Sequence, residues 1–169
     1  VWLRDSAPTF VHDARGEVVL ASWRFNAWAK YANWKRDVQV GAAIERIGGL
    51  PRVLPCRPDR GEDLLRSAGD GARDAQRVVL EGGAIDANGA GRLLTTEECL
   101  LSKTQQRNPG LSRADYERVF AEALGIRETI WLGEGCVGDD THGHVDDIAR
   151  FVAPGVMVIA HEEDPADEN

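Results

Sequence analysis

Long apolar runs are missing from the sequence: none approaches the roughly 20 residues that a bilayer-spanning helix needs, and no basic-then-apolar signal opens the chain. We therefore expect a cytoplasmic protein with no membrane partner. Cysteine is also scarce. Cys56, Cys99 and Cys136 lie far apart, form no C-x-x-C pair and are odd in number, which fits a reducing compartment better than a disulfide framework. We expect each to be a small core residue.

Positive charge is in deficit. The 20 lysines and arginines are outnumbered by 28 acidic residues, and the resulting net charge of −8 repels nucleic acid and favours cationic ligands. Trp23, Trp28 and Trp34 could stack on bases, but without a basic patch we expect them to pack in the core. The glycine-rich stretch 89–91 precedes no helical pattern, which argues against a phosphate-binding loop.

The chain of 169 residues, 43% of them hydrophobic, is long enough for one domain with a sizeable core. It begins without methionine and stops in the acidic stretch 161–169, so we expect an internal fragment of a longer protein. Within it we expect an α/β architecture that repeats a strand-strand-helix-strand unit. The approximate units are 5–56, 76–133 and an incomplete 138–169, together forming a single partial domain over 1–169.

Turn and helix signals define these units. The first has a hairpin turn at 13–16, a helical face over 38–47 ended by two glycines, and a short strand in 50–55. The second has the hairpin signal Asn88-Gly89, a helix that Ser112 caps and Gly125 ends, and the strand "ETIWLG". The third opens with "HVDDIARFVAPGVMVIAHEE", which turns at Pro154-Gly155.

Polar residues recur on or just before the first strand of each unit. Asp5 lies 11 residues before the turn glycine Gly16, Glu81 lies 8 before Gly89, and His144 and Asp146 lie 11 and 9 before Gly155. Equivalent positions of a cyclic repeat meet at its axis, so the spacing predicts one acidic pocket. Because alternate strand residues share a face, we expect His144 and Asp146 to point the same way, opposite to Val145 and Asp147.

Such a pocket suits a guanidinium group. Carboxylates accept paired hydrogen bonds from its planar fork, and a histidine beside them can move protons near neutral pH. Hydrolysis at the guanidinium carbon would still need a nucleophile.

Other interpretations of these residues stay open. The series "HGHVDD" places His142, His144 and Asp146 at alternate positions, as in some metallo-hydrolases, although Asp147 stands where those have a further histidine. His144 and Asp146 could instead form a surface ion pair, Asp5 could pair with Arg4, Glu81 could simply end a strand, and Asp140 could be a solvated loop residue.

Several stretches resemble the agmatine deiminase family, which includes the Porphyromonas-type peptidylarginine deiminases. They occur in family order: "WLRDSAP", "WRFNAW", "LEGGAIDANGAGRLLTTEECLL", "RNPGLS" and "GDDTHGHVDDIARFVAP". The resemblance implies the pentein fold, an α/β propeller of five ββαβ blades, of which this chain would hold two to three.

The resemblance also implies conversion of agmatine to N-carbamoylputrescine and ammonia through a covalent cysteine-thiouronium intermediate, in putrescine biosynthesis and polyamine metabolism. It implies no metal and no cofactor. Asp5 and Asp146 resemble the carboxylates that grip the guanidinium, His144 the general acid/base, and Glu81 the acidic residue of the pocket. Trp2 would be a wall near the substrate, and Asp140 matches a position that can meet the distal amine.

Two departures from the family pattern matter. Ala7 stands where the family usually has glycine, and the glycine-rich segment ending in His-Cys, which carries the family's nucleophile, is missing. We expect this chain to be inactive alone. It is either part of a guanidine deiminase, for agmatine or for peptidyl or other guanidines, or a non-catalytic module that binds a guanidinium or amine. Unclosed blade edges would favour association into a homo-oligomer.

Overall fold

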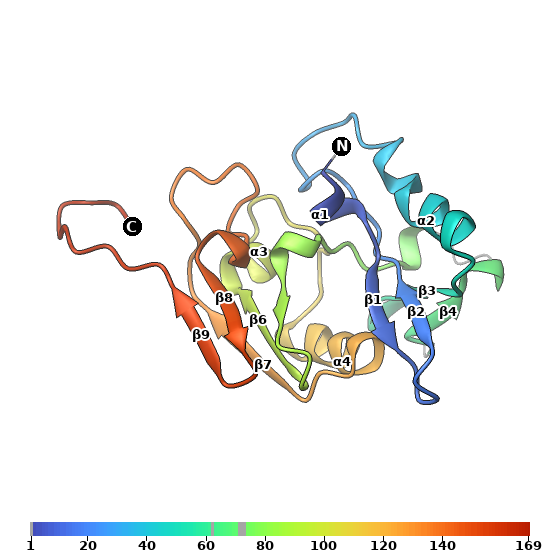
Figure 1. Ribbon diagram of the computed structural model, residues 1–169. Coiled ribbons are helices and arrows are strands. Elements are labelled where there is room, and N and C mark those ends of the chain that lie inside the picture. The colour runs from blue at the N-terminus through green and yellow to red at the C-terminus, as the bar shows by residue number, and fades with distance from the viewer. Residues whose placement is uncertain (1, 62, 71–73) are drawn as a thin grey trace.

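The computed structural model describes residues 2–61, 63–70 and 74–169, which form three separate β-sheets with helices packed between and beside them (Figure 1). The sheets have the strand orders β1-β2-β3-β4, β5-β6-β7 and β8-β9. The fold is therefore mixed α/β, as expected, and no sheet closes into a ring in these ranges. No helix among these residues is long and apolar enough to cross a membrane.

The first sheet begins with the expected hairpin. The short helix α1 (Leu3–Ser6) leads into β1 (Thr9–His12), which pairs antiparallel with β2 (Val18–Ala21). Helix α2 (Val40–Gly48) then crosses to β3 (Arg52–Pro55), which is parallel to β2, and ends where Gly49 adopts a φ of 63°. Strand β4 (Leu65–Ser67), which sequence patterning missed, joins β3 antiparallel.

The second sheet repeats this order. Strand β5 (Asp86–Ala87) pairs antiparallel with β6 (Arg92–Thr96), and α4 (Arg113–Leu124) crosses to the parallel strand β7 (Glu128–Leu132). Helix α4 has the predicted ends: Ser112 and Asp115 form a capping box, and Gly125 closes the helix with a φ of 67°. The additional helix α3 (Glu97–Leu101) follows β6 directly.

The third sheet is the predicted hairpin of β8 (Ala149–Ala153) and β9 (Val156–Ile159). It is attached to β5 through Asp86, which accepts a hydrogen bond from the Phe151 amide at 2.6 Å and pairs with Arg150 at 3.1 Å. The remaining helical segments are 3-10 turns: Asp37–Gln39, Pro58–Arg60, Ala68–Asp70, Asp74–Gln76, Gly82–Ala84 and Val145–Asp147.

The last of these turns corrects one expectation. Residues 144–147 were predicted to be extended, but 145–147 form a 3-10 turn. The carboxylate of Asp139 accepts hydrogen bonds from the amides of Gly143 and His144, at 3.0 and 3.2 Å, and Gly143 takes a φ of 84°. This local bonding overrides the alternating pattern. Val145 still points into the apolar interior, and His144 points away from it into a polar pocket.

The main core joins the first two units. Tyr116 and Phe120 of α4 are fully buried against Leu80 and Leu93, and Trp23, two residues after β2, packs in the same cluster. Full burial of a large apolar side chain contributes about 1.5–3 kcal/mol. The chain around Leu80 is thereby fixed, and with it Glu81, the next residue.

Candidate active site

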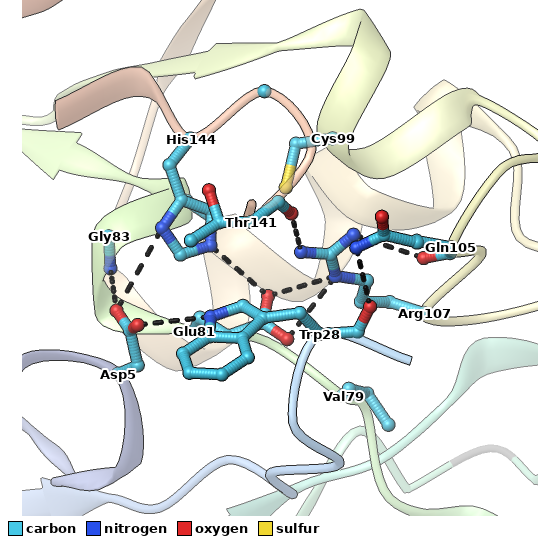
Figure 2. A network of polar contacts seen from close by, with 12 residues as sticks. Asp5, Trp28, Val79, Glu81, Gly83, Cys99, Gln105, Arg107, Thr141 and His144 are labelled. Carbon is cyan, nitrogen blue, oxygen red and sulfur yellow. Dashed lines mark hydrogen bonds and ion pairs between the residues drawn. The ribbon is translucent and has the colours of Figure 1, made fainter. Parts of the chain in front are cut away.

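The structure brings Asp5, Glu81 and Asp146 together around the imidazole ring of His144, and Figure 2 shows the first two of these carboxylates beside it. His144 Nδ1 lies 3.9 Å from Asp5 Oδ1 and 3.9 Å from Asp146 Oδ1, and His144 Nε2 lies 3.8 Å from Glu81 Oε2. Asp5 comes from α1, Glu81 from the end of the buried stretch 78–81, and the other two from the loop and turn before β8. Segments distant in sequence therefore build one polar cluster.

Asp5 is buried and held on both sides. Its Oδ1 accepts a hydrogen bond from the Gly83 amide at 3.0 Å, and its Oδ2 accepts one from the Trp28 indole at 3.1 Å. Burial raises the pKa of Asp5, although its contacts with His144 and Gly83 act in the opposite direction. The considered pair with Arg4 is wrong: Arg4 Nε lies 3.3 Å from Asp146 instead.

Gly83 is required by close packing. A Cβ at this position would lie 2.8 Å from Asp5 Oδ1 and 2.9 Å from His144 Cε1, distances that real Cβ atoms do not tolerate. The glycine therefore lets the backbone donate to Asp5 while the imidazole ring lies directly beside it.

Glu81 is completely buried, so it does more than end a strand. Burial opposes its ionisation, but His144 and Arg107 together hold its pKa below the ordinary value. Arg107 Nε lies 3.3 Å from both carboxylate oxygens, and the rest of the guanidinium donates to the backbone oxygens of Gln105 and Thr141. Glu81 is therefore ionised and shared between a fixed cation and the histidine.

Sequence reasoning assigned no role to Arg107. The two partners are 26 residues apart and belong to different loops, so no local pattern links them. The available signal was chemical: an acidic residue next to a strongly apolar stretch needs a buried cation.

His144 is 3% exposed, which excludes the surface ion pair considered above. Its Nε2 has no hydrogen-bond partner among the described residues. Burial alone lowers the pKa of an imidazole, but the carboxylates of Glu81 and Asp5 outweigh it, and the pKa of His144 is raised. The ring can thus hold a proton near neutral pH, with Nε2 facing the buried Glu81 and Nδ1 facing Asp5 and Asp146.

A cavity of about 660 Å³ opens over this cluster. Its acidic lining consists of Asp5, Asp37, Asp139, Asp140, Asp146 and Asp147, and the basic residues Arg4 and His144 also line it. Trp2, 67% exposed, stands at its rim, with Phe25, Trp28 and Tyr31 forming a further aromatic wall. An acidic cavity with aromatic walls suits an organic cation.

A left-handed turn shapes this wall. Ala27, Trp28 and Ala29 have φ angles of 51°, 58° and 53°, which non-glycine residues rarely adopt in succession. The turn is held by the Trp28 indole on Asp5 and by Gln105, which donates to the Trp28 carbonyl at 3.1 Å.

Asp140 lines the cavity, but its carboxylate already has partners. It accepts hydrogen bonds from Lys30 Nζ and, at 2.6 Å, from the Tyr31 hydroxyl. These bonds, that from Lys30 above all, lower the pKa of Asp140. It is therefore a bonded residue and not a merely solvated one.

The considered metal trio does not assemble. His142 turns to Glu98, at 3.3 Å, and to Ser102, at 3.2 Å, away from His144. Another donor set, formed by Glu81, Cys99 and His144, has its ligand atoms within 4.8 Å of one another. Glu81 is engaged by Arg107, and burial raises the pKa of the Cys99 thiol.

The three cysteines are free. Cys56 and Cys99 are buried as expected, whereas the expectation for Cys136 is wrong because it is exposed. Burial raises the pKa of Cys56 as well as that of Cys99. Neither buried thiol lines the cavity over His144.

Comparisons with known proteins identify the family of this chain. A family model for Porphyromonas-type peptidyl-arginine deiminase matches residues 1–169. Agmatine deiminases of Pseudomonas syringae pv. syringae and Ectopseudomonas mendocina are 39% and 42% identical over 173 aligned residues, which cover 99% of this chain and 41% of each relative. The chain thus spans about two fifths of the length of these relatives.

Solved structures show the same relation. Agmatine deiminase of Enterococcus faecalis superposes with a TM-score of 0.79 at 34% identity, covering 98% of this chain and 41% of that one. A cysteine-to-serine variant of C. jejuni agmatine deiminase with substrate bound has a TM-score of 0.77 at 28% identity, covering 99% and 44%. Because the family model spans the whole sequence, the chain belongs to the Porphyromonas-type peptidyl-arginine deiminase family.

Proposed function

We propose that this chain forms the guanidinium-binding part of a deiminase that hydrolyses agmatine to N-carbamoylputrescine and ammonia. The observation that carries the proposal is the placement of His144 between the carboxylates of Asp5, Glu81 and Asp146 in an acidic cavity. The named relatives add support, because those covering most of this chain are agmatine deiminases.

Each site residue has a role in this reaction. Asp5 and Asp146 accept hydrogen bonds from the guanidinium and hold it in one plane. His144 is the general acid and base, and Glu81, ionised beside Arg107, keeps its ring protonated. Trp2 forms a wall at the rim, and Asp140 meets the distal amine.

The proposed chemistry passes through a thiouronium intermediate. A cysteine thiolate attacks the guanidinium carbon, His144 protonates the leaving nitrogen, and ammonia departs. Water then attacks the same carbon and gives its proton to His144, which releases the ureido product and restores the thiolate.

The nucleophile in this scheme comes from outside the 169 residues. Cys99 is 1% exposed and Cys56 is 3% exposed, and burial keeps both thiols protonated. Cys136 is exposed but does not line the cavity over His144. The C. jejuni relative in which a cysteine was changed to serine, with substrate bound, supports a cysteine-dependent reaction.

A peptidyl or other guanidine is the alternative substrate, which the description of the family model favours. The alternative function is that of a non-catalytic module that binds a guanidinium or an amine. For the parent protein we propose a pentein propeller, to which the approximate units 5–56, 76–133 and 138–169 contribute two to three of five blades. Its place would be the cytoplasm, in polyamine metabolism that leads to putrescine.

Release of ammonia and ureido product from agmatine tests this function. The 169-residue chain and its full-length parent are compared, each as wild type and as His144→Asn. We expect turnover only in the wild-type parent, with agmatine binding kept in its His144→Asn variant. The exposed His12 gives the matched control, since His12→Asn should leave turnover unchanged. A His144→Asn parent that still turns over agmatine would remove His144 from its role.

A further inference from the structure

Two cations of the chain lie on the two carboxylates that the proposed function reserves for the substrate. Arg4 Nε is 3.3 Å from Asp146 Oδ2, and Lys30 Nζ donates to Asp140 Oδ1. Arg4 carries a guanidinium and Lys30 a primary ammonium. These are the same two groups that terminate agmatine, each on the carboxylate assigned to its counterpart.

Both contacts are of a kind that a ligand can replace. The Arg4 side chain is 47% exposed and that of Lys30 is 37% exposed, so each is already partly in contact with solvent. Partly exposed ion pairs of flexible side chains contribute little stability. Besides Asp146, Arg4 donates to the Ile85 carbonyl at 3.2 Å, a bond that the guanidinium also gives up when it leaves.

Arg4 lines the cavity, whereas Lys30 lies just behind its lining residues Tyr31 and Asp140, and the two cations come from different elements. Arg4 belongs to α1, one residue before the buried Asp5. Lys30 directly follows the left-handed turn of residues 27–29, next to Tyr31, which lines the cavity and also bonds Asp140. Tyr31 offers the same carboxylate a neutral donor, whereas Lys30 neutralises its charge.

We propose that Arg4 and Lys30 are specificity-determining residues that occupy the guanidinium and amine subsites of the free protein, so that the substrate binds by exchanging with them. This inference rests on the proposed function. It implies that the chain lowers its own affinity for cationic ligands, and that a ligand with only a guanidinium exchanges with Arg4 alone.

Calorimetric titration tests this exchange with agmatine and with butylguanidine, which lacks the distal amine. Lys30→Gln should lower the dissociation constant of agmatine about two- to fivefold and leave that of butylguanidine unchanged. A weak ion pair that no longer has to be broken changes the dissociation constant by up to about a factor of five. Arg4→Gln should lower the dissociation constants of both ligands by a similar factor. Arg4→Lys, which keeps a cation beside Asp146, should lower them less.

Two controls separate exchange from other effects. Arg15→Gln makes the same charge change at Asp13 on the first hairpin, away from the cavity, and should alter neither affinity. Tyr31→Phe removes a neutral tether of Asp140 and should not tighten agmatine. Weaker agmatine binding in Lys30→Gln would make Lys30 a tether and overturn the inference.

The outcomes distinguish this inference from the function beneath it. If agmatine binds the wild type and both glutamine variants with equal affinity, the exchange is refuted and the proposed function stays intact. If agmatine binds none of these three proteins, the proposed ligand and the exchange are refuted together.

Discussion

At the scale of single residues, the protonation of His144 depends on a charge that does not touch it. Arg107 lowers the pKa of His144 directly, as one cation near another, yet it also keeps Glu81 ionised, and Glu81 raises the same pKa. When Arg107 is replaced, its direct lowering of the pKa of His144 is lost. Glu81 still has His144 as a partner that favours its ionised form, so it continues to raise the pKa of His144.

Arg107→Met should therefore raise the pKa of His144, and that of Glu81 as well. A histidine whose folded pKa is raised stabilises the fold fully below its unfolded pKa of about 6.5, and this contribution is lost as pH rises through the folded value. In Arg107→Met that loss should move to higher pH. Titration of the imidazole signals by NMR, with His144→Asn for assignment, measures the shift.

Breaking a buried pair costs about 3–5 kcal/mol, so a second pair of variants keeps this test decisive. Arg107→Lys retains the charge and should leave His144 closer to wild type. Arg57→Met removes another buried arginine, which bonds Asp59 and the Pro109 carbonyl and not Glu81, and should not shift the pKa of His144. An equal shift in Arg57→Met would show that general loosening, not charge, controls His144.

The residues of the site differ in how far sequence could predict them. Asp5, Glu81 and His144 could be grouped because each stands at a similar distance before a hairpin turn. Arg107, which ionises Glu81, and Asp139, which folds the loop before His144, could not. Their roles come from contacts that only the folded chain creates.

At the scale of elements, the wall of the cavity depends on a backbone conformation that its residues disfavour. A left-handed residue with a Cβ costs about 1–2 kcal/mol, and the turn has three in succession. Hydrogen bonds from Trp28 to Asp5 and from Gln105 to Trp28 compensate for this cost and couple the wall to the site.

The same substitution should therefore have opposite effects in two elements. Ala29→Gly, at a φ of 53°, should stabilise the protein by up to about 1 kcal/mol because glycine lacks the disfavoured Cβ. Ala121→Gly, on the exposed face of α4, should destabilise it by about 0.5–1 kcal/mol. Urea unfolding of both variants measures the difference, and equal losses would argue against the left-handed turn.

Elements were predictable where their signals are local. Helix α4 carries its capping box and its terminal glycine within its own sequence, and the hairpin β1–β2 carries its turn. Strand β4 was missed because three residues show no period, and residues 145–147 were misread because Asp139 bonds the preceding backbone amides. No alternating pattern reports such a bond.

At the scale of the whole molecule, apolar surface concentrates on one hairpin. Val156, Met157, Val158 and Ile159 of β9 are between 42% and 55% exposed, and β9 pairs only with β8 within the described ranges. Both faces of this strand and its outer edge are open. In Figure 1 the hairpin lies at one end of the molecule, where another chain can reach it. Such an edge favours pairing with a second strand.

We therefore expect the chain to self-associate through antiparallel pairing of two β9 strands, with a weight-average mass that rises with concentration in light scattering. Val158→Lys should lower this association, because a lysine on the edge strand opposes pairing. The charge alone predicts the reverse, since one lysine reduces the net −8 to −7 and weakens repulsion between copies. Phe10→Lys makes the same charge change at an exposed position of β1. If Phe10→Lys lowers association as much as Val158→Lys does, β9 is not the interface. If only Val158→Lys lowers association, the two copies associate through β9.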